Sequence, residues 1–290
     1  MSVSRSKRAL QILGAGASAV LALSLAACGA AGAPVDGDKA EVKLGDTFTV
    51  AATEVPHVDI LQFVKDNLAE EAGINFEIKP FSDYPLGNRW LSEGEVEANY
   101  FQHRPYLDAQ VEEFGYDIVP LSDVHVEPYA AFSEKHKSLA DLPDGATISV
   151  TNDASNQERA LNLLAQEGLV TLPGEGEVSE LSVLAIEGDK KYNPRGFDFI
   201  EADPASQARA LADVDLGILN GNYFLDAGFT LKDALIVEPL EGNIYANFLT
   251  VRAADKNDPR LLKLDELLTS PETKAFIEKT WPGGDVSPAF

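Results

Sequence analysis

The stretch "EANYFQHRPYLDAQ", residues 97–110, gathers aromatic residues where a strand gives way to a helix. Pro105 disfavours helical backbone in the residue before it and fits the first position of a helix, so a helix is predicted from Pro105 to Phe114. The preceding residues 95–99, "EVEAN", predict a brief strand. Residues 101–103 then fall in the connecting turn.

The residue types around this turn are unusual, because turns normally use small polar residues. The stretch instead carries Tyr100, Phe101, His103 and Tyr106. Ligands of open α/β sheets bind beyond the carboxyl ends of the strands, so these side chains are expected to form one wall of a ligand pocket. Ordinary core aromatics with one satisfied histidine would give the same pattern, and the residue types alone leave both interpretations open.

On both sides of this junction, short β-rich runs alternate with helical patterns, which implies parallel βαβ units and an α/β fold. The helix from Pro105 is expected to turn Leu107, Val111 and Phe114 toward the core. Further strands are predicted at residues 47–53, 74–81, 116–121, 128–134, 146–152, 181–187, 197–202, 214–220 and 245–252. Further helices are predicted at residues 58–71, 86–92, 155–168 and 204–212, with two more after residue 252, the last capped by Ser270.

A chain of 290 residues is long enough for two domains with their own cores. The simplest arrangement is two α/β lobes, with the chain returning to the first lobe at its end. Lobe 1 is predicted to comprise residues 46–125 plus 240–290, and lobe 2 residues 126–239. Two segments would then cross between the lobes, near residues 121–129 and 237–246.

The N-terminal residues predict export and a lipid anchor. A basic "MSVSRSKR" precedes an apolar run ending in "LAAC", which resembles a bacterial lipobox. Residues 1–27 are therefore expected to be a lipoprotein signal peptide, and residues 28–45 a lipidated Cys28 followed by a flexible linker. The alternative is an uncleaved transmembrane helix. Either way the folded part would lie at the outer face of the bacterial cytoplasmic membrane, on a tether.

The charge of the chain excludes some classes of partner. The formal net charge is -24, and loss of the three cationic residues of the signal peptide would make it -27. Such a surface repels nucleic acid and anionic lipid headgroups.

The stretch "VTNDASNQERAL", residues 150–161, predicts a helix start beside a cation. Ser155 and Glu158 have the spacing of a capping box. Arg159 follows one turn into the helix, where free amides and a guanidinium suit a carboxylate ligand. Arg159 could equally pair with a surface glutamate.

Asparagines stand at the edges of two apolar strands. Asn220 and Asn222 lie in "ILNGNYFLDAG" (218–228), and Asn243 and Asn247 in "NIYANFLTVR" (243–252). A buried asparagine offers both a donor and an acceptor, which suits it to bind the backbone of an amino acid. Turn formation could explain the Asn-Gly-Asn run, but it explains Asn247, inside a strand, less well.

Several stretches resemble the methionine-binding lipoproteins of the NlpA family, the receptors of methionine ABC importers. They are "ATEVPHVDIL", "EANYFQHRPYLD", "KSLADLPDGATISVTNDASNQERALNLLAQEGLVTL", "GILNGNYFLDAG" and "YANFLTVR". The resemblance implies a two-lobed periplasmic-binding-protein-like (type II) fold, with a hinge and an interlobe cleft that closes on methionine (L, possibly D). It also implies delivery to a permease with its cytoplasmic ATPase.

The resemblance assigns roles to individual residues. Arg159 matches the arginine that takes the ligand's α-carboxylate, and Asn220 and Asn247 match asparagines that contact the ligand backbone. The ring-rich wall around the ligand side chain is matched by Phe81, Tyr84, Phe101, His103 and Tyr106. No cofactor and no metal site are expected, because His57, His103, His125 and His136 show no paired ligand spacing.

Two departures from the family leave the ligand's size open, the strand "EPYAAFSEK" and the acidic loop "PGEGEVSE" at residues 173–180. Another amino acid or a short peptide therefore remains an alternative ligand. A membrane-tethered hydrolase is an alternative from another class, although the chain has neither a Gly-x-Ser-x-Gly nor a His-Glu-x-x-His motif. A metal receptor and a purely adhesive lipoprotein are further alternatives.

Overall fold

A computed structural model describes residues 42–290 of the chain. The predicted signal peptide, Cys28 and nearly all of the linker lie outside these described residues. Among the helices of residues 42–290, none combines the length and the apolar character needed to cross a membrane.

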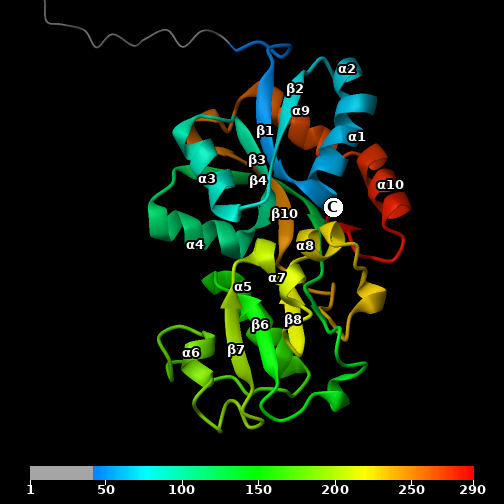
Figure 1. The fold of residues 1–290 in the computed structure, drawn as a ribbon. Helices are drawn as coiled ribbons and strands as arrows, with labels where there is room; N and C mark the ends of the chain where they lie inside the picture. The colour runs from blue at the N-terminus through cyan, green and yellow to red at the C-terminus, as the bar shows by residue number, and fades with distance from the viewer. Residues whose placement is uncertain (1–41) are drawn as a thin grey trace, which may run out of the picture. The chain divides into compact units, whose positions relative to one another are not determined.

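The larger sheet has six strands in the order β11-β4-β10-β3-β1-β2 (Figure 1). Strand β1 pairs in parallel with β2 on one side and β3 on the other. Strand β10 lies antiparallel between β3 and β4, although only parallel units were predicted. Their bounds are β1 Phe48–Thr53, β2 Phe76–Phe81, β3 Ala98–His103, β4 Ile118–Val126, β10 Ala246–Arg252 and β11 Ser287–Pro288.

Helices cover both faces of this sheet, and successive side chains of each strand pack against opposite sets of helices. Val50 and Ala52 of β1 pack with helices α1, α9 and α10, whereas Ala51 packs with α3 and α4 on the other face. Ser270 caps α10 as predicted. The helices and turns on these faces are η1 Glu54–Val58, α1 Asp59–Asn67, α2 Ala69–Ala72, α3 Tyr84–Glu93, α4 Arg104–Phe114, η4 Ala253–Asp255, α9 Pro259–Leu268 and α10 Pro271–Thr280.

The smaller sheet has five strands in the order β7-β6-β8-β5-β9. Strand β6 pairs in parallel with β7 and β8, β5 pairs antiparallel with β8, and β9 forms the edge antiparallel to β5. The strands are β5 Ala130–Phe132, β6 Thr147–Thr151, β7 Asp198–Ala202, β8 Leu216–Leu219 and β9 Ile236–Val237. The helices and turns are η2 Leu139–Asp141, α5 Ala154–Gln166, α6 Val183–Ile186, α7 Pro204–Ala210, α8 Gly221–Asp226 and η3 Leu231–Asp233.

The chain passes between the two sheets twice. Residues 127–129 join β4 of the larger sheet to β5 of the smaller one, and residues 238–245 join β9 to β10. In Figure 1 the orange strand β10 returns among the earlier blue and green strands. Both segments fall within the predicted crossing stretches. The lobe boundaries at residues 125 and 239 stay a prediction, because residues 41–290 form one compact unit.

Three predictions about helical segments away from the cavity differ from the structure. The predicted strand at 181–187 is wrong, because Val183–Ile186 form helix α6 with Leu184 facing solvent at 80% exposure. A short apolar run fits either element, so periodicity could not decide between them. Phe114, expected on the core side of α4, is 51% exposed. The helix predicted over 58–71 is interrupted at Leu68, between α1 and α2.

Candidate functional site

A small cavity, partly open to solvent, lies where the two sheets meet. It is bordered by the end of β3, the start of β10, the first crossing segment and the first turns of α5 and α8. Its lining residues are Tyr84, Phe101, Gln102, His103, Tyr106, Glu127, Asn156, Arg159, Asn220, Gly221, Asn222 and Asn247.

Strand β3 carries the aromatic wall. The prediction of a turn at residues 101–103 was wrong, because β3 runs to His103 and α4 begins at the next residue. The expectation for the side chains nevertheless holds, since Phe101 and His103 lie one pleat apart and both line the cavity. Tyr100, the residue before Phe101, belongs to the core on the opposite face.

Three rings enclose one end of the cavity. The ring centroids of Tyr84, Phe101 and Tyr106 lie 5.6 to 5.8 Å from one another. Phe81 does not line the cavity and instead packs behind Phe101, with the two centroids 5.1 Å apart. Gly87 of α3 makes room for these rings, because a Cβ there would lie 2.7 Å from both Phe81 and Phe101.

Helix α5 points its first turn at the cavity. The predicted capping box is wrong, because Asp153 rather than Ser155 is the N-cap residue. The Asp153 carboxylate accepts the backbone N–H of Asn156 at 3.0 Å and the Ser155 hydroxyl at 3.0 Å. This cap fixes the first turn, and it turns Asn156 and Arg159 toward the cavity.

Arg159 pairs with a glutamate of the protein, which was one of the two interpretations, and it also lines the cavity. Its guanidinium donates through Nε and Nη2 to the carboxylate of Glu238, at 2.8 and 2.5 Å, and through Nη2 to the carbonyl of Glu127 at 3.0 Å. The guanidinium stacks 3.9 Å above the ring of Tyr245. Within residues 42–290, Nη1 makes no hydrogen bond, so a positively charged donor remains for the cavity that Arg159 lines.

A chain of hydrogen bonds fixes the polarity of the opposite wall. The backbone N–H of Tyr106 donates to Nδ1 of His103, so Nε2 of this neutral imidazole carries the hydrogen and donates to Oδ1 of Asn156 at 3.0 Å. Asn220 donates its Nδ2 to the same oxygen at 3.1 Å. Among the described residues, Oδ1 of Asn220 is then a buried acceptor without a partner. Burial, and next the charge of Arg159, lower the pKa of His103 to about 3.

The other three asparagines differ in their surroundings. Asn247 lines the cavity, and its Oδ1 lies 3.2 Å from Nε2 of His57 while its Nδ2 points toward the carbonyl of Tyr245. Asn222 also lines the cavity and accepts the hydroxyl of Tyr84 at 2.5 Å. Asn243 lies in the second crossing segment, bonded to Glu238, and is not part of this cavity wall.

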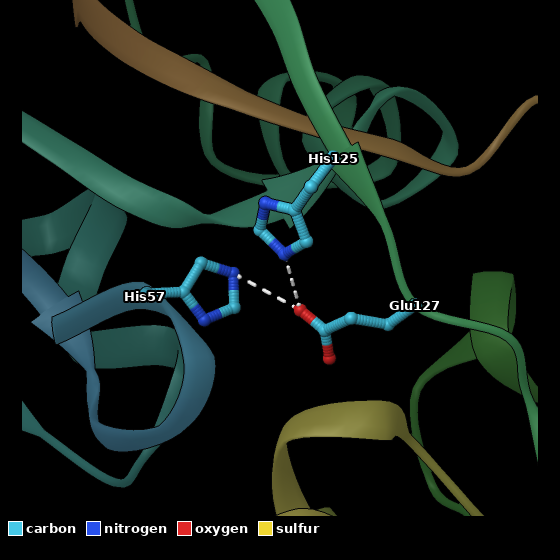
Figure 2. Close-up of side chains that lie close together, drawn as sticks. All are labelled: His57, His125 and Glu127. Atoms are coloured by element: carbon cyan, nitrogen blue, oxygen red, sulfur yellow. Dashed lines mark hydrogen bonds and ion pairs between the residues drawn. The ribbon is translucent and has the colours of Figure 1, made fainter. Parts of the chain in front are cut away.

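Two histidines behind the cavity and a glutamate of its lining were not predicted as a group. Figure 2 shows His57, His125 and Glu127, named here the His-Glu cluster. One oxygen of Glu127, Oε1, lies 2.7 Å from Nε2 of His125 and 3.3 Å from Nε2 of His57. Burial lowers the pKa of His57 to about 4 and that of His125 to about 3. Burial raises the pKa of Glu127, opposed by His57 and by Arg159.

The His-Glu cluster has ligand types that Zn²⁺ prefers. Its spacing is that of hydrogen bonds, however, because two ligands of one tetrahedral zinc ion would lie about 3.3 Å apart. The 2.7 Å between His125 and Glu127 is shorter than that. Sequence spacing could not reveal the cluster, because residues 57 and 127 meet only through the tertiary fold.

Comparison with known proteins agrees with this architecture. The family model described as NlpA lipoprotein matches residues 48–290. The methionine-binding lipoprotein MetQ of Bacillus subtilis is 38% identical over 268 residues, which cover 91% of this chain and 93% of MetQ.

Two solved structures resemble the fold. One, titled a nutrient binding protein from Burkholderia cenocepacia bound to methionine, shares 38% identity with a TM-score of 0.79, over 84% of this chain and 100% of that chain. The other, an ABC transporter periplasmic substrate-binding protein from Coxiella burnetii, shares 36% identity with a TM-score of 0.74, over 83% of this chain and 100% of that chain. The resemblance found in the sequence motifs is confirmed, and the chain belongs to the NlpA lipoprotein family.

Proposed function

We propose that this chain is an extracytoplasmic, lipid-anchored substrate-binding protein that binds methionine in the cavity between its sheets and delivers it to the permease of an ABC importer. The observation that carries the proposal is the polarity of the cavity walls. A cation and an unpartnered buried oxygen face the same small space, with aromatic rings at one end. This arrangement complements a zwitterion with an apolar side chain.

The carboxylate end is matched by donors. Arg159 brings a full positive charge, held in place by Glu238 and by stacking on Tyr245. Asn247 has its oxygen engaged by His57 and one N–H directed at the carbonyl of Tyr245, which leaves its second amide N–H for the cavity. A charge-assisted hydrogen bond of this kind is about twice as strong as a neutral one.

The ammonium end is matched by acceptors. Asn220 has a buried Oδ1 without a partner in the described part of the chain, and an unmade hydrogen bond at a buried atom costs about 1 to 3 kcal/mol. A ligand ammonium would recover that free energy. The carboxyl group of Glu127, which also lines the cavity, adds negative charge at the same wall.

The side-chain end favours a soft apolar group. A thioether gains about 0.3 to 1.5 kcal/mol for each contact with an aromatic ring, and three rings surround this end. Such contacts discriminate by only about 1 to 3 kcal/mol for each methylene, so recognition of an amino acid should be sharper than recognition of methionine.

The relatives support the ligand and the setting. The Bacillus subtilis relative is named for methionine binding, and the Burkholderia cenocepacia structure holds methionine. The Coxiella burnetii structure is named as part of an ABC transporter. For this chain we infer acylation of Cys28, location at the outer face of the cytoplasmic membrane, and docking of the ligand-bound form on a permease with its ATPase. Binding would shift a conformational population without making or breaking a bond.

Calorimetry on the soluble chain without its signal peptide and cysteine tests the proposal. Protein refolded from denaturant, and so free of carried-over ligand, should bind one equivalent of L-methionine. D-methionine and the dipeptide Gly-Met measured alongside give the stereochemical and size preference. Binding of Gly-Met but not of either methionine would favour the peptide alternative. Absence of binding to all three would reject the proposal.

A further inference from the structure

The His-Glu cluster includes a residue of the first segment that passes between the sheets and contacts the strand that follows the second. Glu127 belongs to the first crossing segment, and Asn247, which His57 contacts, is the second residue of β10. The two histidines come from the larger sheet, His57 from η1 and His125 from the end of β4. All three side chains of the cluster are at most 6% exposed. The cluster therefore connects the hinge region directly to a residue of the cavity wall.

The direction of the hydrogen bonds follows from the partners. On the far side of each ring, Nδ1 meets a hydroxyl group, that of Thr53 for His57 at 2.8 Å and that of Tyr100 for His125. On the near side, both Nε2 atoms face Oε1 of Glu127. When Glu127 is ionised its carboxylate only accepts, so each hydroxyl donates to Nδ1 and each Nε2 carries the hydrogen.

The direction of these hydrogen bonds determines which atom of the Asn247 amide faces His57. Nε2 of His57 lies between Oε1 of Glu127 and Oδ1 of Asn247, at 3.3 and 3.2 Å. An N–H at that position holds the amide oxygen of Asn247 and leaves its NH₂ group for the cavity. With the hydrogen on Nδ1 instead, Nε2 would attract the NH₂ group, and Asn247 would present its oxygen to the ligand.

We propose that His57 and Glu127 are positioning residues that hold the amide of Asn247 with its NH₂ group toward the cavity, and so select the carboxylate end of the ligand at that wall. This inference rests on the proposed binding of a zwitterion in the cavity. Glu127 acts through the tautomer of His57, and His57 acts through the orientation of Asn247. The lowered pKa of His57 is consistent with this, because a neutral imidazole carries only one N–H.

A double-mutant cycle tests the positioning role. His57→Leu should weaken methionine binding at least tenfold, whereas His57→Gln, whose Nε2 can donate to the same oxygen, should retain affinity within about threefold. In an Asn247→Ala background, His57→Leu should have almost no further effect. Equal losses in both backgrounds would overturn the proposal, because they would mean that His57 does not act through Asn247. His136→Leu is the matched control, because His136 bonds Asp215 on the smaller sheet, away from the cavity.

Nuclear magnetic resonance of the ligand-free protein gives a second test, which needs neither a folded leucine variant nor methionine binding. Long-range ¹H–¹⁵N spectra of histidine-labelled wild-type protein distinguish the two neutral tautomers. His57 and His125 should both carry their hydrogen on Nε2 at neutral pH. A hydrogen on Nδ1 of His57 would overturn the proposal. Failure of the wild type to bind methionine in calorimetry would instead reject the proposed function, which keeps the two failures distinguishable.

Discussion

Replacing Arg159 with alanine removes the cation of the cavity wall. The side chain is 4% exposed, and its Nε and Nη2 are held by Glu238 and by the carbonyl of Glu127. The guanidinium is thus fixed before a ligand arrives, and its charge faces the cavity without reorganisation. A bound methionine carboxylate would lose its only cationic partner among the lining residues.

The magnitude follows from that loss. Truncating one partner of a buried charge pair costs about 2 to 5 kcal/mol. Arg159→Ala should therefore weaken methionine binding by roughly 30-fold to 4,000-fold. The variant should also be less stable than the wild type, because the carboxylate of Glu238 is left nearly buried without its ion-pair partner.

Isothermal titration calorimetry measures the change in affinity, and circular dichroism confirms that the variant is folded at the temperature used. Arg159→Lys keeps the charge but loses the pair of hydrogen bonds to the carboxylate of Glu238. Its methionine affinity should therefore lie between those of the alanine variant and the wild type. Arg195→Ala is the matched control, since Arg195 pairs with Asp144 at the surface. Methionine affinity unchanged in folded Arg159→Ala would refute the assignment of the carboxylate to this residue.

Four further outcomes are expected. Asn220→Ala should weaken methionine binding about 5-fold to 140-fold in calorimetry, because the ammonium loses its acceptor; an unchanged affinity would contradict this. Gly87→Ala should cost about 1 to 3 kcal/mol in urea unfolding, because a Cβ would lie 2.7 Å from Phe81 and Phe101, whereas Gly188→Ala, which meets no atom within 4 Å, should cost little. The unfolded chain binds protons at its histidines below pH 6.5. In the folded protein, burial lowers the pKa values of His57, His103 and His125 to about 4, 3 and 3, so these side chains stay neutral at that pH. The free energy of unfolding should consequently fall as the pH decreases from 6.5 to 5, by up to about 1.4 kcal/mol per pH unit for each of these histidines, and pH-independent urea midpoints over that range would contradict their burial as neutral groups. Treatment with EDTA should leave the melting temperature unchanged, because the His-Glu cluster is spaced for hydrogen bonds; a clear decrease would indicate a bound metal.

Local signals in the sequence predicted much of the architecture. Runs of β-favouring residues predicted strands β1 and β10, and Ser270 with Pro271 predicted the cap of α10. All three form within two residues of the predicted positions. The same holds for Arg159, whose place one turn into α5 follows from the helix start alone. Its pairing with Glu238 could be stated only as an alternative, because residues 159 and 238 approach each other through the fold.

The errors also have physical reasons. The residues 101–103 predicted as a turn form strand because β10 pairs with them, with Asn247 opposite His103 and Phe248 opposite Gln102, although pairing with β1 ends at Tyr100. Asp153 rather than Ser155 caps α5. The sequence could not decide between them, because both residue types are good caps and they lie only two positions apart. The His-Glu cluster required the positions of three separate segments, which no local pattern contains.

The most direct test of the central claim is a crystal structure of the protein with methionine. The account predicts the ligand carboxylate at Nη1 of Arg159 and Nδ2 of Asn247, the ammonium at Oδ1 of Asn220, and the thioether against the rings of Tyr84 and Phe101. A methionine bound in the reverse orientation, or bound outside this cavity, would contradict it.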